Sequence, residues 1–349
     1  MEEKPLLHYD REGLETLLRE RFGVPAFHGR QLHAWLYRRG VFDPARLTDL
    51  SKALRAALAA LTRTVLPRTL EAVTGEAEST ATKFLFELED GERVEAVYIP
   101  AGDRNTVCLS SQVGCAYGCR FCATGQLGLK RNMTAGEMAG CFLAVRAAVP
   151  ERITNVVFMG MGEPLANPVE VMEAWRRLTD PDGIGLSQRR VTLSTIGLPK
   201  AIRRLAGEPC PPKLVFSIGS PREELRRKLL PVAGRFSLEE NHAALREYAR
   251  NSKHRITIAL LVAEGLNDSP EDARALHRWI GELPAKVNLL RYNEAAGGFR
   301  RADEGKVEAV AQTLVSLGRT VILRASRGRD VSAACGQLAA RALTSPERR

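Results

Sequence analysis

Short apolar runs alternate with segments of helical periodicity from about residue 105 onward. This alternation is typical of parallel strands that are joined by crossover helices. The apolar runs occupy residues 106–110, 155–159, 191–194, 214–217, 256–262 and 287–290, with a further run at 320–323. We therefore predict an α/β fold in which residues 105–318 form a partial (β/α)6 TIM-like barrel and residues 319–349 form a C-terminal segment. In such barrels the functional residues gather where the strands end.

The first 70 residues are predicted to form a separate, helical accessory domain. Apolar side chains recur there at helical spacing, first at Leu32, Trp35 and Leu36 and then at Leu47, Leu50, Leu54 and Leu61. Basic side chains at 30, 38 and 39 lie beside Trp35 and Tyr37, a mixture that suits contact with RNA phosphates and bases. An ordinary amphipathic helix explains the same residues equally well.

Residues 71–104 are predicted to form a β-hairpin extension. Two β-rich runs, 82–88 and 94–99, flank the turn-forming pair Asp90-Gly91. Alternation along the second run places Glu95 on the same face as Val97 and Ile99. Partial desolvation would make that carboxylate a stronger base, whereas most strand glutamates point to water.

The chain carries 51 lysines and arginines against 41 aspartates and glutamates, which gives a net charge of +10. Residues 1–70 hold 12 basic and 8 acidic side chains and residues 318–349 hold 7 and 2, so the centre is nearly neutral. This distribution predicts a central reaction chamber between termini that hold a polyanion, with nucleic acid the leading candidate. Solvated arginines are the alternative. A hydrophobic content of 44% excludes a largely disordered chain.

No stretch approaches the roughly 18 apolar residues of a membrane span, and the first four residues lack the plan of a signal peptide. We expect a cytoplasmic protein without a membrane partner. Seven cysteines in 349 residues are too few for a disulfide scaffold, so their spacing needs another explanation.

Three of the cysteines, Cys115, Cys119 and Cys122, form a C-x3-C-x2-C motif shortly after the first apolar run. A structural zinc ion takes four protein ligands, and no fourth cysteine or histidine stands nearby. Three thiolates on a four-iron cluster instead leave one iron open to a substrate. The motif therefore predicts a [4Fe-4S] cluster, the alternative being three buried thiols without a function.

Two other cysteines are assigned no chemistry. Cys141 belongs to the apolar stripe of a helix that begins at the capping box formed by Thr134 and Glu137, so it is predicted to be a core residue. Cys210 lies in a proline-rich loop.

A glycine-rich segment, Met159-Gly160-Met161-Gly162-Glu163-Pro164, follows the second apolar run. Its glycines allow a ligand to approach the backbone, and its carboxylate can bind an ammonium group. A simple turn at a strand end is the alternative.

Further segments at 123–125, 130–134, 193–195 and 327–338 complete a set of motifs, of which Ala-Ala-Cys-Gly-Gln-Leu at 333–338 is the most discriminating. Together they resemble the RlmN/Cfr family of radical S-adenosylmethionine RNA (adenine) methyltransferases over nearly the whole chain. The resemblance implies a radical S-adenosylmethionine barrel with a [4Fe-4S] cluster and S-adenosylmethionine as cofactors. It implies that the cluster is held by Cys115, Cys119 and Cys122. It implies that the S-adenosylmethionine site is lined by Gly162, Glu163, Ser194, Ser217 and Asn293. In the reaction, the resemblance implies that Cys335 carries the methyl group, that Cys108 resolves the adduct and that Glu95 accepts a proton.

The implied reaction methylates C2 or C8 of an adenosine, ring carbons whose hydrogens are not usefully acidic, so a radical must act. The usual target in the family is adenosine 2503 of 23S ribosomal RNA, and some members also modify a transfer RNA. The target base must be extruded into the barrel mouth. The resemblance further implies an electron donor such as flavodoxin or ferredoxin, a transient disulfide between Cys108 and Cys335, and a monomeric enzyme.

The chain departs from the family pattern at Gly219, where a histidine is usual. Residues 194–197 and 290–293 resemble the Cfr branch, which methylates C8, more than the RlmN branch, which methylates C2. Two other functions stay open: a radical methylase of a small molecule or peptide, and a non-catalytic iron–sulfur RNA-binding protein. Cys335→Ala distinguishes the binding protein from an enzyme. A binding protein would be unaffected by this substitution, whereas a methylase would lose its methylated product while still cleaving the cofactor.

Overall fold

The computed structural model describes residues 4–61, 66–76, 80–295, 297–324 and 327–339. Within these residues the core is a ten-stranded sheet of order β1-β2-β3-β4-β7-β8-β9-β10-β11-β12. The strands β4 (Thr106–Leu109), β7 (Asn155–Phe158), β8 (Val191–Thr195), β9 (Lys213–Ser217), β10 (Ile256–Val262), β11 (Ala285–Arg291) and β12 (Val321–Arg324) are parallel to their neighbours in this series. The predicted partial barrel is confirmed, and the run at 320–323 adds a further parallel strand.

The predicted hairpin is also confirmed, as β2 (Thr82–Glu87) and β3 (Arg93–Ile99), which extend the sheet from β4. A third antiparallel strand, β1 (Arg68–Thr74), pairs with β2 and was not predicted. Its side chains are exposed or only half-buried, so its sequence lacks the apolar alternation that identifies a strand.

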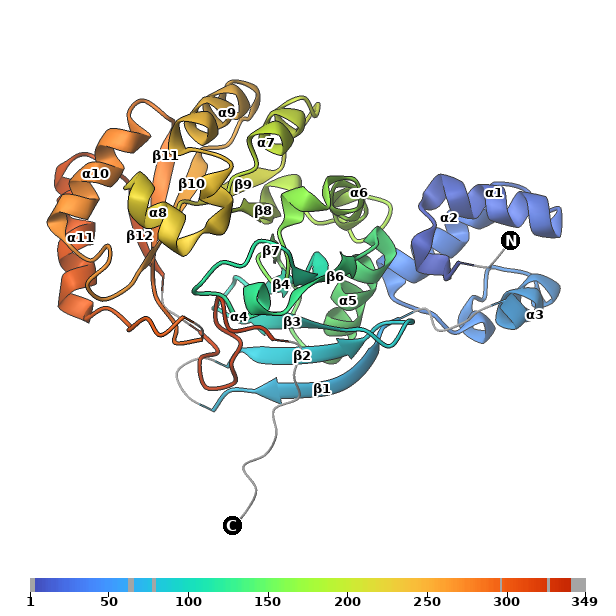
Figure 1. The fold of residues 1–349 in the computed structure, drawn as a ribbon. Coiled ribbons are helices and arrows are strands. Elements are labelled where there is room, and N and C mark those ends of the chain that lie inside the picture. The colour runs from blue at the N-terminus through green and yellow to red at the C-terminus, as the bar shows by residue number, and fades with distance from the viewer. Residues whose placement is uncertain (1–3, 62–65, 77–79, 296, 325–326, 340–349) are drawn as a thin grey trace, which may run out of the picture.

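Helices cover the outer face of the parallel strands (Figure 1). They are α5 (Ala135–Ala148), α6 (Pro168–Thr179), α7 (Pro199–Ala206), α8 (Glu223–Leu229), α9 (Leu238–Asn251), α10 (Pro270–Ile280) and α11 (Glu304–Ser316). The capping box at the start of α5 is present, with the Thr134 side chain accepting from the Glu137 backbone and the Glu137 side chain accepting from the Thr134 backbone. Cys141 of this helix is a core residue, as predicted.

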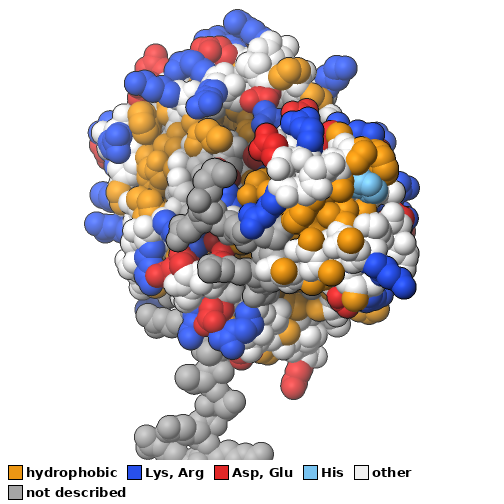
Figure 2. All heavy atoms as spheres, turned by 90° about the vertical axis from the view of Figure 1, so that its right-hand side faces the viewer, with side chains coloured by type: hydrophobic (Ala, Val, Ile, Leu, Met, Phe, Trp, Pro, Cys, Tyr) orange, Lys and Arg blue, Asp and Glu red, His pale blue; other side chains and the backbone are white. Residues whose placement is uncertain are grey.

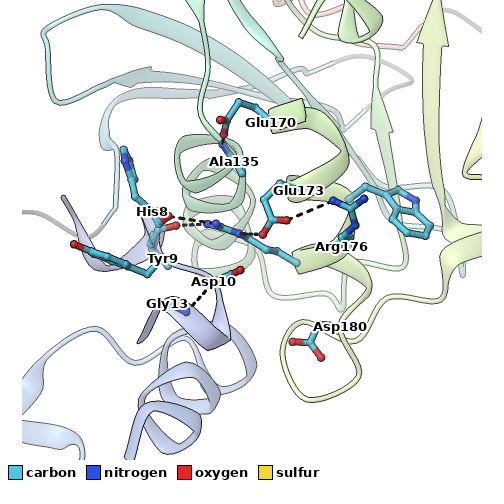
Figure 3. A network of polar contacts seen from close by, with 12 residues as sticks. His8, Tyr9, Asp10, Gly13, Ala135, Glu170, Glu173, Arg176 and Asp180 are labelled. Carbon is cyan, nitrogen blue, oxygen red and sulfur yellow. Dashed lines mark hydrogen bonds and ion pairs between the residues drawn. The ribbon is translucent and has the colours of Figure 1, made fainter. Parts of the chain in front are cut away.

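The N-terminal region is helical, as predicted, with α1 (Arg11–Phe22), α2 (Phe27–His33) and α3 (Lys52–Leu61) lying to one side of the barrel, beyond α5 and α6 (Figure 1). Arg177 of α6 anchors this region. Its guanidinium donates to the backbone oxygens of Leu7 and His8 and pairs with Glu173 at 3.0 Å. Figure 3 shows His8 and Glu173 in this network of polar contacts. Because the Arg177 side chain is 7% exposed, these contacts form away from bulk water.

Among the residues that the structure describes, the surface seen from the side of the N-terminal helices has no single patch of positive charge (Figure 2). Lysine and arginine side chains are spread over this face, with acidic side chains and apolar areas between them (Figure 2). The described residues include no helix that is long and apolar enough to cross a membrane.

Candidate active site

The interior of the partial barrel is an open cavity of about 1230 Å³. Its walls are the inward-facing residues of the parallel strands, which alternate along each strand with residues of the outer core. The strand register gives the order of these residues along the cavity. Thr106 lies opposite Asn155, and Cys108 lies opposite Val157, two residues nearer the carboxyl-terminal ends of both strands. Cys108 therefore lies nearer than Thr106 to the carboxyl-terminal end of the cavity.

Cys335 and Cys108 both line this cavity, together with Cys122. Burial, assisted by the nearby Cys335, raises the pKa of Cys108 to about 12, so the neutral thiol predominates at neutral pH. All seven cysteines belong to the described residues, and all are free thiols. The disulfide expected between Cys108 and Cys335 is therefore not formed in this structure.

The tail segment, residues 327–339, lies beside α4 (Ala123–Gln126) and β3 (Figure 1). Hydrogen bonds hold it there: the Ala123 backbone donates to Gly336 O at 2.7 Å, Thr124 Oγ1 to Leu338 O at 2.6 Å, Asn293 Nδ2 to Cys335 O at 3.3 Å and the Ala339 backbone to Glu95 Oε2 at 2.8 Å. Cys335 is thereby fixed next to the residues that directly follow Cys122.

The loop with the three clustered cysteines is carried by a two-stranded ribbon, β5 (Gln112–Cys115) and β6 (Gly128–Asn132). This ribbon was not predicted, because its strands are short and β6 is largely exposed. Cys115 ends β5, and Cys122 caps the start of α4. The cysteine loop is therefore held between a strand, β5, and a helix, α4.

Burial raises the pKa of Cys115 to about 11 and that of Cys119 well above its usual value, and nearby thiolates add to both effects. Among the described residues, no three His, Cys, Asp or Glu side chains converge at single-ion distances. A four-iron cluster distributes its thiolates over separate irons, so its ligands need not converge in this way. Three neighbouring thiols, of which Cys115 and Cys119 are buried and Cys122 is half-buried, fit such a cluster, whose positive iron atoms would favour the thiolates.

Gly162 and Glu163 follow β7 at the edge of the same loop. Gly162 has a φ of +95°, and a Cβ there would lie 2.5 Å from the Gln112 side chain, so only glycine fits. Glu163 is buried, and its carboxylate accepts from the Leu165 backbone at 3.0 Å and the Ile196 backbone at 2.9 Å. Burial raises the pKa of Glu163 to about 7.

The remaining residues predicted to line the cofactor site lie on neighbouring strands. Ser194 of β8 and Ser217 of β9 are brought together, with their hydroxyl oxygens 3.4 Å apart. Asn293, which follows β11, lines the cavity, but its amide binds Cys335 O and accepts from Arg301 Nη1 at 3.0 Å. In this structure Asn293 therefore holds the tail segment.

Glu95 is buried at 1% exposure and pairs with Lys83, itself 4% exposed, at 3.1 Å. Hairpin pairing places Lys83 opposite Val97, which in turn lies opposite Cys108. Glu95 consequently occupies the cavity-facing side of β3, two residues beyond the level of Cys108. Its apolar surroundings were predicted, whereas its lysine partner and its hydrogen bond to Ala339 were not.

Gly219, which replaces the family histidine, has a φ of +71°, and a Cβ there would lie 2.7 Å from Leu230 Cδ1. A side chain at this position would require both a strained backbone and a movement of Leu230. Cys210, in contrast, is exposed and donates to Gln188 Oε1 at 2.8 Å.

Sequence reasoning missed several supporting basic residues. Buried Arg226 donates to the carbonyl oxygens of Ile218 and Ile196, which fixes the loops after β9 and β8. Arg324 lines the cavity near Met159 Sδ, at 3.8 Å. The hydrogen-bond partners of Arg226 and Arg324 lie in other segments of the fold, so no local sequence pattern indicated these contacts. Lys83 differs, because its position in the hairpin register places it near Glu95.

Comparison with known proteins identifies the family. Residues 4–63 match the ribosomal RNA large subunit methyltransferase N-terminal domain, and residues 109–277 match the radical SAM superfamily. The chain is 41% identical to a "Dual-specificity RNA methyltransferase RlmN" of Anaeromyxobacter dehalogenans, over 96% of this chain and 94% of the relative. The chain belongs to the RlmN family of radical SAM RNA methyltransferases.

Other members of the RlmN family agree. The chain is 43% identical to a "Probable dual-specificity RNA methyltransferase RlmN" of Thermus thermophilus, over 93% of this chain and 92% of the relative. A crystal structure of a radical SAM methyltransferase from Sphaerobacter thermophilus superimposes with a TM-score of 0.91 at 39% identity, covering 97% of this chain and 99% of that one. The protein is thus a radical SAM RNA methyltransferase, and its family implies a [4Fe-4S] cluster and S-adenosylmethionine.

Proposed function

We propose that this RlmN-family enzyme methylates C2 of an adenosine in RNA, namely adenosine 2503 of 23S ribosomal RNA and an adenosine of a transfer RNA, through a methyl group carried on Cys335. The RlmN similarity extends over nearly the whole chain, which favours C2 over the C8 suggested by residues 194–197 and 290–293. The observation that carries the proposal is that Cys335 and Cys108 line one cavity with Cys122. Transfer through a cysteine needs one thiol that carries the carbon and another that releases it.

When bound, the cluster and S-adenosylmethionine supply the methyl group and the radical chemistry that an electron-poor ring carbon requires. We assign the cluster to Cys115, Cys119 and Cys122 and S-adenosylmethionine to Gly162, Glu163, Ser194, Ser217 and Asn293. Glu163 supports this assignment, because a buried carboxylate at a glycine-rich turn offers a charge for the methionine ammonium. A small redox protein such as flavodoxin or ferredoxin would donate the electron.

The two thiols act in sequence. Cys335 Sγ would accept the methyl group and lose its own thiol proton. The bound cofactors would supply the radical that removes one hydrogen atom from this methyl group, so that its carbon can bond to the ring carbon; the ring would then lose one electron and its proton. Cys108 attacks Cys335 Sγ, so the sulfur–carbon bond breaks, the bonding pair stays with the carbon and a proton completes the new methyl group. The resulting disulfide between Cys108 and Cys335 is reduced by an external dithiol. Because burial raises the pKa of Cys108 to about 12, its thiol must lose a proton before it attacks.

Glu95 is proposed to accept the ring proton. Its cavity-facing position on β3 supports this role, and its carboxylate lies 3.1 Å from the Lys83 ammonium group. Its Oε2 also accepts from the Ala339 backbone, so the proposed base and the tail segment are in direct contact.

The deciding experiment incubates anaerobically reconstituted enzyme with deuterated-methyl S-adenosylmethionine and either 23S ribosomal RNA or transfer RNA, followed by mass spectrometry of the nucleosides. We expect labelled 2-methyladenosine from the wild type and from Cys210→Ala, an exposed-thiol control, and none from Cys335→Ala. Labelled 8-methyladenosine would overturn the choice of C2. Absence of both nucleosides, with S-adenosylmethionine consumed, would overturn the RNA substrate.

A further inference from the structure

The amino-terminal end of the same cavity carries basic side chains that the proposed reaction does not use. They are Arg104, Arg189, Arg190, Lys213, Lys253, His254, Arg255 and Lys286, here called the basic mouth. Each lies at the start of a parallel strand or within three residues before it, so the barrel topology gathers them at one edge of the sheet. Within the described chain, this cavity is lined by no aspartate or glutamate.

The positive charges of the basic mouth lack counter-charges. In the part of the chain that the structure describes, none of its lysines and arginines forms an ion pair, although Arg190 donates to Asn155 and Arg255 to Ala285 O. Burial, followed by Arg324 and Arg190, lowers the pKa of Arg104. Burial, followed by neighbouring positive charges with Lys286 first, also lowers the pKa of Lys213. The basic mouth is therefore under mutual electrostatic repulsion.

Basic residues elsewhere on the barrel behave differently. On the outer helices, Arg203 pairs with Glu247 at 3.0 Å and Arg274 pairs with Glu271 at 2.6 Å. The absence of acidic partners is thus a property of this edge of the cavity and not of the whole surface. Unpaired, converging guanidinium and ammonium donors are suited to an anion that carries several charges.

We propose that the basic mouth binds phosphate groups, at least two at a time, from either a free polyphosphate compound or an RNA backbone. This site goes beyond the proposed methylation. Its residues start the strands β8 and β9, whose other ends hold Ser194 and Ser217, about 13 Å away for four residues of extended chain. The phosphate ligand therefore does not contact the reacting thiols, and it enters from the opposite end of the barrel.

The test uses full-length, cluster-reconstituted protein and isothermal titration with inorganic tripolyphosphate. We expect saturable binding that weakens at least tenfold in Lys213→Gln/Lys286→Gln. The matched control, Arg203→Gln/Arg274→Gln, removes the same charge from the outer helices and is expected to change affinity less than twofold. No saturable binding by the wild type, or equal weakening in both double variants, would overturn the proposal.

A second mouth variant, Arg189→Gln/Arg190→Gln, changes exposed residues only and guards against misfolding of the first. Tripolyphosphate should raise the melting temperature of the wild type and the control more than that of either mouth variant. Equal increases in all four proteins would contradict the site.

A single-stranded RNA oligonucleotide distinguishes the two phosphate sources. Displacement of tripolyphosphate by the RNA supports the site with RNA as its ligand, whereas retention supports it with a free polyphosphate compound. None of these measurements requires methyl transfer, so failure of the proposed C2 methylation would leave them interpretable.

Discussion

The two ends of the barrel cavity differ in how they treat charge. At the carboxyl-terminal end, Lys83 pairs with Glu95 and both oxygens of Glu163 accept backbone N–H groups, so both buried carboxylates have partners. At the amino-terminal end, the basic mouth gathers positive charges, and no aspartate or glutamate of the described chain lines the cavity. One set of strands thus separates an end with partnered carboxylates from an end with uncompensated positive charge.

The largest expected difference between the two ends follows from Cys122→Ser. Serine cannot supply a thiolate, so bound iron should fall from about four atoms per chain to near zero and methylation should be abolished. Tripolyphosphate affinity should stay within twofold, because the basic mouth does not depend on the cluster. Iron analysis and titration calorimetry check both, with Cys210→Ser as the control. Parallel loss of tripolyphosphate binding would show that the two ends are coupled.

Removal of a lysine should have opposite effects at the two ends. Lys83→Gln leaves Glu95 buried without its ion-pair partner, which should lower the free energy of unfolding by about 3–5 kcal/mol. Lys286→Gln removes a mutually repelled charge, so the free energy of unfolding should stay unchanged or rise. Urea unfolding measures both. Lys83→Gln/Glu95→Gln should recover part of the loss, and equal destabilisation by both single variants would remove the distinction.

The affinity for S-adenosylmethionine should rise with pH. Because burial raises the pKa of Glu163 to about 7, a proton competes with the methionine ammonium below that pH. We expect affinity to increase by up to about tenfold from about pH 6 to pH 8. Glu163→Gln should bind about tenfold more weakly at pH 8 and show little pH dependence. A pH profile shared by both proteins would exclude Glu163 as the titrating group.

The smallest effect, and one of opposite sign, is expected at the basic mouth. Burial, Lys213 and Arg189 lower the pKa of His254, so this side chain is neutral near pH 7 without a ligand. A phosphate group favours the protonated form, so tripolyphosphate should bind about threefold tighter at about pH 6 than at pH 8. His254→Gln retains only the titration of the ligand itself, and an unchanged profile would rule out this contribution.

Much of the fold could be predicted because most of the parallel strands are largely buried and so appear as short apolar runs. The hairpin was equally clear, since Asp90-Gly91 sets its turn and thereby its register, with Gly91 at a φ of +81°. β1 and the ribbon of β5 and β6 were missed because exposed or four-residue strands carry little periodic signal.

The candidate site was only partly accessible to the sequence. Local motifs predicted the cysteine loop and Gly162-Glu163, but the hydrogen bond from Asn293 to Cys335 joins segments whose proximity depends on tertiary structure. Charge counting predicted a neutral centre, because acidic residues of the outer helices balance the basic mouth in any sum along the chain. The sheet topology separates these charges in space, which a count cannot do.

The attachment of the tail segment to Ala123 and Thr124 has a practical consequence for any preparation of this enzyme. The residues that present Cys335, the proposed methyl acceptor, contact the backbone and hydroxyl groups directly next to Cys122, a proposed iron ligand. If both proposals hold, incomplete metallation should impair two things together, the generation of radicals and the alignment of the Cys335 sulfur. Specific activities of variants are consequently best compared per mole of intact cluster and not per mole of polypeptide.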